Sequence, residues 1–261
     1  TITNTGVIQA VKDVSLEVTE GKLQNNSTIL AQTGAVTAKA YDAIDNSGLI
    51  ASSGDISLVS LDKSMKNSGE IISTSGAVAL KAKTKLDHSD GLIKAKNNIG
   101  LTAETEGVTI NNKIVSTDAD LKVTSYGDIS STGTLQANGD IAITATNGRF
   151  HNNAGNVLAD NGKLNIRALS VKNDSTAPNN GYLQGNELQF IATARDIENA
   201  GVMHSKIGGE VVAKNSVINT QNIELENAAT ITATDKDVTN TGLILSTKAL
   251  AITAADTVSN R

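Results

Sequence analysis

A repeat of about 21 residues runs through the whole chain, and it limits the folds open to this sequence more than any other feature. It is plainest in the segments Asn46-Ser-Gly-Leu-Ile50, Asn67-Ser-Gly-Glu-Ile71 and Asn240-Thr-Gly-Leu-Ile244. An apolar anchor residue stands two positions before each such Asn, and eleven of the twelve spacings between anchors are 20 to 22 residues. A unit this short must stack on its neighbours to bury its apolar side chains. The thirteen anchors are Ile2, Leu23, Ile44, Met65, Leu86, Val108, Ile129, Phe150, Val171, Ile197, Val217, Val238 and Val258.

Each repeat is predicted to contain three short strands. The first begins at the anchor, and the third alternates apolar and polar residues, as in Ile56-Ser-Leu58 and Val78-Ala-Leu80. Such alternation is typical of a half-buried strand, and no segment has a helical period. The second strand follows the turn after the Asn, and its apolar stretch is marked by Ile8, Leu30, Ile50, Ile72, Ile93, Val115, Leu135, Leu158, Leu183, Met203 and Ile244.

Pairing each strand with its copy one turn later, in parallel, would bury all three strands. Like side chains then stack in columns, which agrees with a chain of 261 residues that is 39% hydrophobic yet has only 2% aromatic residues. The sequence therefore predicts an all-β protein, a three-sided parallel β-helix (β-solenoid) of about twelve coils forming a single domain over 1–261. The leucine-rich repeat has a similar period, but its Leu pattern and helical half do not occur here.

Asn stands two residues after the anchor in ten of the thirteen repeats. The exceptions are His88, Ile110 and Ser131. Because an Asn side chain both donates and accepts, stacked copies can bond one another and the turn backbone. We expect a structural asparagine ladder, with a polar binding stripe as the alternative, and we expect positive φ at a Gly two residues later. The ladder residues are Asn4, Asn25, Asn46, Asn67, Asn152, Asn173, Asn199, Asn219, Asn240 and Asn260.

One repeat is longer than the others. From Val171 to Ile197 it spans 26 residues and contains the only Pro of the chain, which predicts a corner-loop insertion at 172–182. Loops on rigid scaffolds often carry recognition, so this loop is a candidate binding loop, and a neutral insertion is the alternative. The candidate binding residues are Asp174, Ser175, Thr176, Pro178, Asn179, Asn180 and Tyr182.

The sequence indicates no catalytic, cofactor or metal site. The absence of Cys excludes thiolate chemistry, and a net charge of −5 without a basic block argues against binding to nucleic acid. No apolar run reaches 18 residues, which argues against a transmembrane segment. The three histidines, His88, His151 and His204, lie too far apart in the repeat to share a metal ion.

Two acidic residues form a candidate catalytic pair. Asp120 and Asp140 occupy the same position before the alternating strand in adjacent coils, about 4.8 Å apart in a β-helix, and retaining glycosidases place their carboxyl groups about 5 Å apart. However, Asp13 and Asp55 stand at the same position, where Gly-Asp is ordinary turn chemistry. We expect structural turns and no enzyme, and a polysaccharide-active β-helix enzyme is the lesser alternative.

Two segments of the chain are Asn46-Ser-Gly-Leu-Ile-Ala-Ser-Ser-Gly-Asp-Ile-Ser-Leu58 and Gly133-Thr-Leu-Gln-Ala-Asn-Gly-Asp-Ile-Ala-Ile-Thr-Ala145. Both resemble the haemagglutinin repeat of filamentous haemagglutinins. These are large exoproteins of bacterial two-partner secretion, and they include adhesins and contact-dependent growth inhibition effectors. The resemblance covers essentially the whole chain. It implies a right-handed β-helical shaft, and it carries over no catalytic residues.

The resemblance also implies partners and a location. An outer-membrane two-partner-secretion transporter would export the chain, which would then be secreted or displayed on the bacterial cell surface. There it would support adhesion and virulence, or toxin delivery, and a host-cell or target-cell surface receptor would be its partner. Because the chain starts and ends within the repeat pattern, we expect a fragment of a longer shaft. Direct binding of a receptor or glycan, through the loop or an outer strand face, is the alternative function.

Overall fold

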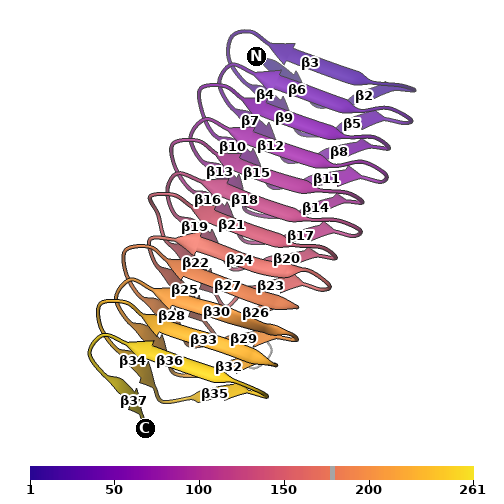
Figure 1. Ribbon diagram of the computed structural model, residues 1–261. Coiled ribbons are helices and arrows are strands. Elements are labelled where there is room, and N and C mark those ends of the chain that lie inside the picture. The colour runs from indigo at the N-terminus through magenta and orange to yellow at the C-terminus, as the bar shows by residue number, and fades with distance from the viewer. Residues whose placement is uncertain (177–179) are drawn as a thin grey trace. The chain divides into compact units, whose positions relative to one another are not determined.

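The computed structural model describes residues 1–176 and 180–261, and these residues form strands and turns without any helix. Three parallel sheets stack as a β-solenoid of about twelve turns, so the predicted fold class is confirmed. Each turn contributes one strand to every sheet, and the stacked strands can be followed by colour in Figure 1. The chain forms two compact units, Thr1–Gly127 (unit 1) and Asp128–Arg261 (unit 2). The expectation of a single domain stays a prediction.

Unit 1 holds the first eighteen strands. Its first sheet contains β1 (Ile2–Asn4), β4 (Leu23–Asn25), β7 (Ile44–Asn46), β10 (Met65–Asn67), β13 (Leu86–His88) and β16 (Val108–Ile110). Its second sheet contains β2 (Val7–Ala10), β5 (Thr28–Ala31), β8 (Leu49–Ser52), β11 (Glu70–Ser73), β14 (Leu92–Ala95) and β17 (Lys113–Ser116). Its third sheet contains β3 (Val14–Val18), β6 (Val36–Ala40), β9 (Ile56–Ser60), β12 (Val78–Ala82), β15 (Ile99–Ala103) and β18 (Leu121–Ser125).

Unit 2 continues the same order of sheets. Its first sheet contains β19 (Ile129–Ser131), β22 (Phe150–Asn153), β25 (Val171–Asp174), β28 (Ile197–Asn199), β31 (Val217–Asn219), β34 (Val238–Asn240) and β37 (Val258–Asn260). Its second sheet contains β20 (Thr134–Ala137), β23 (Asn156–Ala159), β26 (Tyr182–Gly185), β29 (Val202–Ser205), β32 (Asn222–Leu225) and β35 (Leu243–Ser246). Its third sheet contains β21 (Ile141–Ala145), β24 (Lys163–Ala168), β27 (Glu187–Ala192), β30 (Gly208–Ala213), β33 (Ala228–Ala233) and β36 (Leu250–Ala254).

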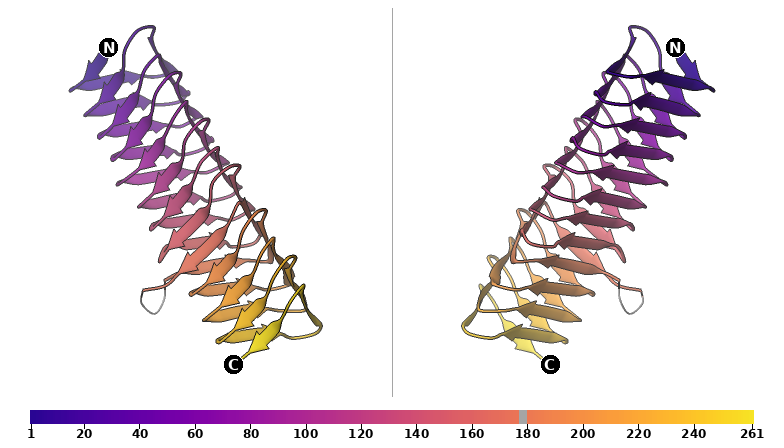
Figure 2. Two further views of the ribbon diagram at one scale, coloured as in Figure 1. Left: turned by 90° about the vertical axis from the view of Figure 1, so that its left-hand side faces the viewer. Right: turned by 90° about the vertical axis from the view of Figure 1, so that its right-hand side faces the viewer.

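The core of each unit is built from columns of like side chains. Every anchor of the repeat is the first residue of a strand of the first sheet. On the third sheet Ile56 pairs with Val78, and both are almost completely buried. The two phenylalanines, Phe150 and Phe190, are fully buried in unit 2. Because stacked branched side chains fill the interior, the chain needs few aromatic residues. Figure 2 shows the strands of each sheet side by side within each unit.

In four turns of the second sheet, the apolar residue that marks the strand in the sequence points outward. In each of these turns the apolar residue before it points inward and is fully buried, whereas the marking residue is only half-buried. Side chains of a strand alternate between its two faces, so an error of one residue exchanges inside for outside. The inward residues are Ile29, Ile71, Ile114 and Val157, and the outward ones are Leu30, Ile72, Val115 and Leu158.

The prediction of positive φ at the Gly two residues after a ladder Asn was wrong. The glycines with positive φ in the described chain are Gly21, Gly91, Gly181 and Gly208, and none of them stands at that position. Gly48 is needed for a different reason, because a Cβ there would lie 2.0 Å from the carbonyl oxygen of Ser27 in the preceding turn. Close approach of two backbones therefore selects Gly at this corner.

Candidate functional site

Three corners join the strands of a turn, and each has its own polar chemistry. The first corner follows the first sheet and carries the asparagine ladder. In unit 1 the Asn4, Asn25 and Asn46 amides each donate to the next ladder side chain at 2.7 Å. The Nδ2 group of Asn46 also donates to the carbonyl of Gly48 at 3.2 Å. The Asn46 side chain thus bonds both the next turn and the main chain of its own corner.

The ladder in unit 2 repeats this geometry over six residues. Its side-chain bonds run from Asn152 to Asn260 with Nδ2–Oδ1 distances of 2.6 to 2.9 Å. The side chains between these ends are buried within the solenoid. A buried amide must find hydrogen-bond partners inside the protein, and here like residues supply them. All ladder residues except Asn260 are buried, so their amides face the interior of the solenoid.

The exceptions to the Asn pattern change the ladder locally. Fully buried His88 receives a hydrogen bond from Asn67 Nδ2 at its Nδ1 atom, and its Nε2 atom lies 3.3 Å from the carbonyl of Lys113. This arrangement fits a neutral imidazole that accepts at Nδ1 and donates from Nε2. Burial lowers the pKa of His88, more strongly than the main-chain carbonyls of Lys113 and Asn67 and the nearby carboxylates raise it.

The ladder of unit 2 begins at an imperfect step. Ser131 pairs in register with Asn152, and both side chains are fully buried. Within the described parts of the chain, the Ser131 hydroxyl and the Asn152 Oδ1 atom have no hydrogen-bond partner. Serine is too short to reproduce the amide-to-amide bond, so this step lacks a contact that the other ladder steps of unit 2 make.

The corner-loop insertion of unit 2 follows β25, which ends at Asp174. Its two described sides are tied together, because Asn180 Oδ1 accepts hydrogen bonds from the Ser175 hydroxyl at 2.9 Å and the Thr176 main-chain N–H at 3.2 Å. Tyr182 begins β26, and its main-chain N–H donates to Asn156 Oδ1 at 3.2 Å. Two of the predicted binding residues, Pro178 and Asn179, lie outside the described residues.

Asp174 anchors the base of the loop. Its Oδ2 atom lies 2.7 Å from His151 Nε2 and 2.9 Å from Lys172 Nζ. Burial acts to raise the pKa of Asp174, but hydrogen bonds from Lys172 and His151 outweigh it and hold that pKa below its ordinary value. All three side chains are partly exposed, so this cluster stabilises the loop base and leaves one face open to solvent.

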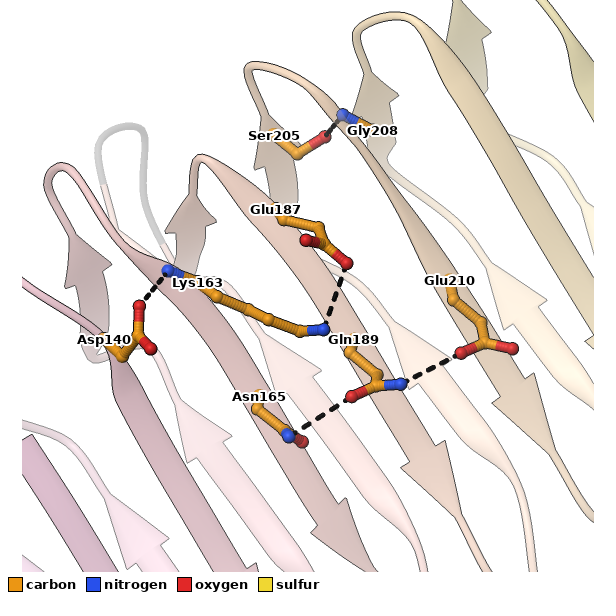
Figure 3. Close-up of polar contacts among 8 residues, drawn as sticks. All are labelled: Asp140, Lys163, Asn165, Glu187, Gln189, Ser205, Gly208 and Glu210. Atoms are coloured by element: carbon orange, nitrogen blue, oxygen red, sulfur yellow. Dashed lines mark hydrogen bonds and ion pairs between the residues drawn. The ribbon is translucent and has the colours of Figure 1, made fainter.

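A second polar cluster covers the outer face of the third sheet in unit 2 (Figure 3). The Asn165 amide donates to Gln189 at 3.3 Å, and the Gln189 amide donates to Glu210 at 3.1 Å. Beside this row, Lys163 forms an ion pair with Glu187 at 3.0 Å. These side chains are in register across β24, β27 and β30, but the sequence alone does not show that they bond in a row.

The acidic residues of the second corner act as turn contacts. Asp13 and Asp55 each accept the main-chain N–H of a residue in the next turn at 2.8 Å. Asp140 does the same for Lys163 at 2.7 Å, as Figure 3 shows. Asp120 belongs to unit 1 and Asp140 to unit 2, and the main-chain N–H of Asp120 donates to Asn98 Oδ1 at 3.1 Å. The aspartate and asparagine side chains at this corner thus hold successive turns together.

The buried serines at strand ends were missed in the sequence. Ser73 Oγ donates to the carbonyl of Gly54 at 2.7 Å, and Ser116 Oγ donates to that of Asn97 at 2.8 Å. Both serines are in register with Ala95 of β14. The signal was a strand end that is Ala or Ser in most repeats, as at Ser73, Ala95 and Ser116.

His204 lies on the outer face of the second sheet, in register with Gln184 and Glu224. His88, His151 and His204 therefore occupy three different environments. Over residues 1–176 and 180–261, no group of three or more His, Asp or Glu side chains could hold a metal ion. Over the same ranges, no helix is long and apolar enough to span a membrane.

Comparison of the chain with protein-family models, with curated proteins and with solved structures finds no match.

Proposed function

We propose that this chain is a structural stalk segment of a large secreted bacterial surface exoprotein of the filamentous haemagglutinin type. It would be exported by an outer-membrane two-partner-secretion transporter and would support adhesion or contact-dependent toxin delivery at the cell surface. In this role the chain is not an enzyme. The haemagglutinin-like segments Asn46–Leu58 and Gly133–Ala145 support the assignment to this type of protein.

One observation carries the proposal of a stalk: within each unit, successive turns offer one another nearly the same contacts. Ile44 pairs with Met65 and Val217 with Val238, each 21 residues further along the chain. The ladder bonds join the same atoms at each Asn-to-Asn step of a unit. A turn that presents the same upper and lower surface can be added or removed without altering its neighbours. Such a construction serves spacing and display.

A second candidate is an adhesive module that binds a host receptor or glycan directly. Two features favour it, namely the tied base of the corner loop, from Asp174 to Tyr182, and the amide row of Asn165 and Gln189 on the outer face. Both place hydrogen-bonding groups on the outside of a rigid scaffold. Recognition sites are commonly built in this way.

The two functions can be separated by deleting one whole turn from the full-length protein on cells. The matched deletions remove residues 44–64, 217–237 or 171–196, and each joins strands that are already equivalent in register. The stalk proposal predicts that all three variants are displayed on the surface and lose attachment or toxin delivery to the same small extent. Loss of attachment in the 171–196 variant alone, with normal display, would reject it in favour of the adhesive module.

A further inference from the structure

We propose that the third corner of unit 2 binds the carboxylate of an acidic saccharide, in a site centred on Ser170 and flanked by Arg149 and Arg195. The third corner joins the third sheet to the first sheet of the next turn. A shallow cavity of about 220 Å³ opens here, lined among others by Asp128, Asn147, Arg149, Leu169, Ser170 and Arg195. This inference goes beyond the stalk role and does not depend on it.

Three turns of this corner in unit 2 show that the position can hold a carboxylate that accepts a backbone N–H. Asp128 Oδ1 accepts the main-chain N–H of Arg149 at 2.9 Å, and Asp196 Oδ1 accepts that of Ser216 at 2.9 Å. Near the last turn, Asp237 Oδ1 accepts the N–H of Thr257 at 3.0 Å. A carboxylate of one turn thus receives the backbone donor of the next turn. We call each such contact an aspartate clasp.

The clasp is missing at Ser170, as it also is for the N–H groups of Asp196 and Asp237 among the described residues, and Ser170 differs from them in the arginines beside it. Because Phe150 pairs with Val171, the residue that precedes Ser170 in this column is Arg149, which has no acceptor. Within residues 1–176 and 180–261, neither the main-chain N–H nor the hydroxyl of Ser170 donates to a protein group. An external carboxylate could therefore occupy the place that Asp side chains fill in neighbouring turns.

Two guanidinium groups supply positive charge around this place. Arg149 is held through its Nε atom by Asp128 Oδ2 at 3.0 Å, which leaves its terminal amino groups without an ion-pair partner in the described chain. Arg195 forms no ion pair with any described residue. These arginines lie one turn before and one turn after Ser170, and both line the cavity with it. Guanidinium groups match the planar geometry of a carboxylate.

The rest of the lining favours a saccharide. Asn147 and Ser170 offer an amide and a hydroxyl to sugar hydroxyl groups, whereas Leu169 alone is a large apolar residue. The carboxylate of Asp128 also lines the cavity and disfavours ligands that carry more than one negative charge at the site. Since Arg149 and Asp128 are largely exposed, the affinity will be modest and will fall as salt is added.

The test titrates the ¹⁵N-labelled chain with galacturonate and follows amide and arginine Nε signals by NMR. We expect saturable shifts at Ser170, Arg149 and Arg195, and none with galactose, which lacks the carboxylate. Arg195→Gln should weaken binding about threefold or more. Lys236→Gln is the matched control, because Lys236 precedes Asp237 as Arg195 precedes Asp196, and it should bind like the parent chain.

A second variant restores the clasp. Arg149→Asp places a carboxylate of the protein beside the Ser170 N–H, so it should abolish binding while the strand signature in circular dichroism is kept. Equal effects of galactose and galacturonate would overturn the proposal, as would equal losses in the Arg195 and Lys236 variants. Tighter binding of N-acetylglycine than of galacturonate would assign the site to a peptide C-terminus and overturn the saccharide assignment.

Discussion

The first and third corners of the solenoid both join successive turns by hydrogen bonds, but they use different side chains to do so. At the first corner, buried amides such as Asn46 bond side chain to side chain along the stack. At the third corner, more exposed carboxylates such as Asp196 accept a backbone N–H from the next turn. A ladder residue must both donate and accept, whereas a clasp residue needs only to accept.

This difference explains why one corner is regular and the other is not. Replacing a ladder Asn leaves one buried donor and one buried acceptor unsatisfied, which is costly in an interior without water. Omitting a clasp, as happens at Ser170, leaves a single N–H near solvent, which water can satisfy. The sequence therefore has Asn in ten of thirteen repeats at the first corner and uses Asp only intermittently at the third.

The largest effect is expected from Asn46→Asp, which removes the side-chain N–H donor of one ladder residue in unit 1. The carboxylate cannot donate to Asn67 and would be buried as a charge, so unfolding should require about 3 kcal/mol less. Urea denaturation measures this loss. Asp45→Asn changes the neighbouring exposed side chain and should cost less than about 0.5 kcal/mol. Equal stability of the two variants would contradict the ladder.

A smaller effect is expected from acid, through His88. Burial lowers its pKa, so the folded state holds the imidazole neutral while the unfolded state takes up a proton near its ordinary value, about 6.5. The stabilising contribution is complete above that pH and declines as the pH falls below it. We expect the urea midpoint of the parent chain to decrease between pH 7.5 and 5.

His88→Asn would restore an amide to the ladder and remove this titration. The midpoint of that variant should change less between pH 7.5 and 5 than the midpoint of the parent chain. His204→Asn is the matched control, because His204 lies on the outer face and is only partly buried. A variant at His88 that keeps the full acid response would show that other groups cause it.

The smallest effects are expected at the third corner. Asp196→Ala removes one acceptor from the Ser216 N–H and should lower stability by about 1 kcal/mol. Asp196→Asn keeps an acceptor oxygen and should be nearly neutral. This exchange is the reverse of Asn46→Asp, so denaturation of the two variants compares the corners directly. A loss at Asp196→Asn as large as that at Asn46→Asp would remove the distinction between them.

Much of the fold could be predicted because the same pattern of anchor, turn and strands recurs along the whole sequence. The anchors identified the strands of the first sheet, and the strict alternation at Ile56 and Val78 identified their inward faces. Alternation failed where two apolar residues are adjacent, as at Ile29-Leu30, since either face could then be the inner one. The asparagine column was visible in the same way, whereas the serine contacts and the outer amide row were not.

The sequence by itself determined the period, the parallel stacking and the position of the polar ladder, because equivalent residues in consecutive turns must meet. Only the tertiary structure decided which groups have partners and which do not. It showed that Arg149 interrupts the aspartate clasps, and that Ser170 keeps an unused backbone donor between two arginines. The physical reason is that periodicity fixes which residues are neighbours, whereas hydrogen bonding depends on the directions and distances of individual atoms.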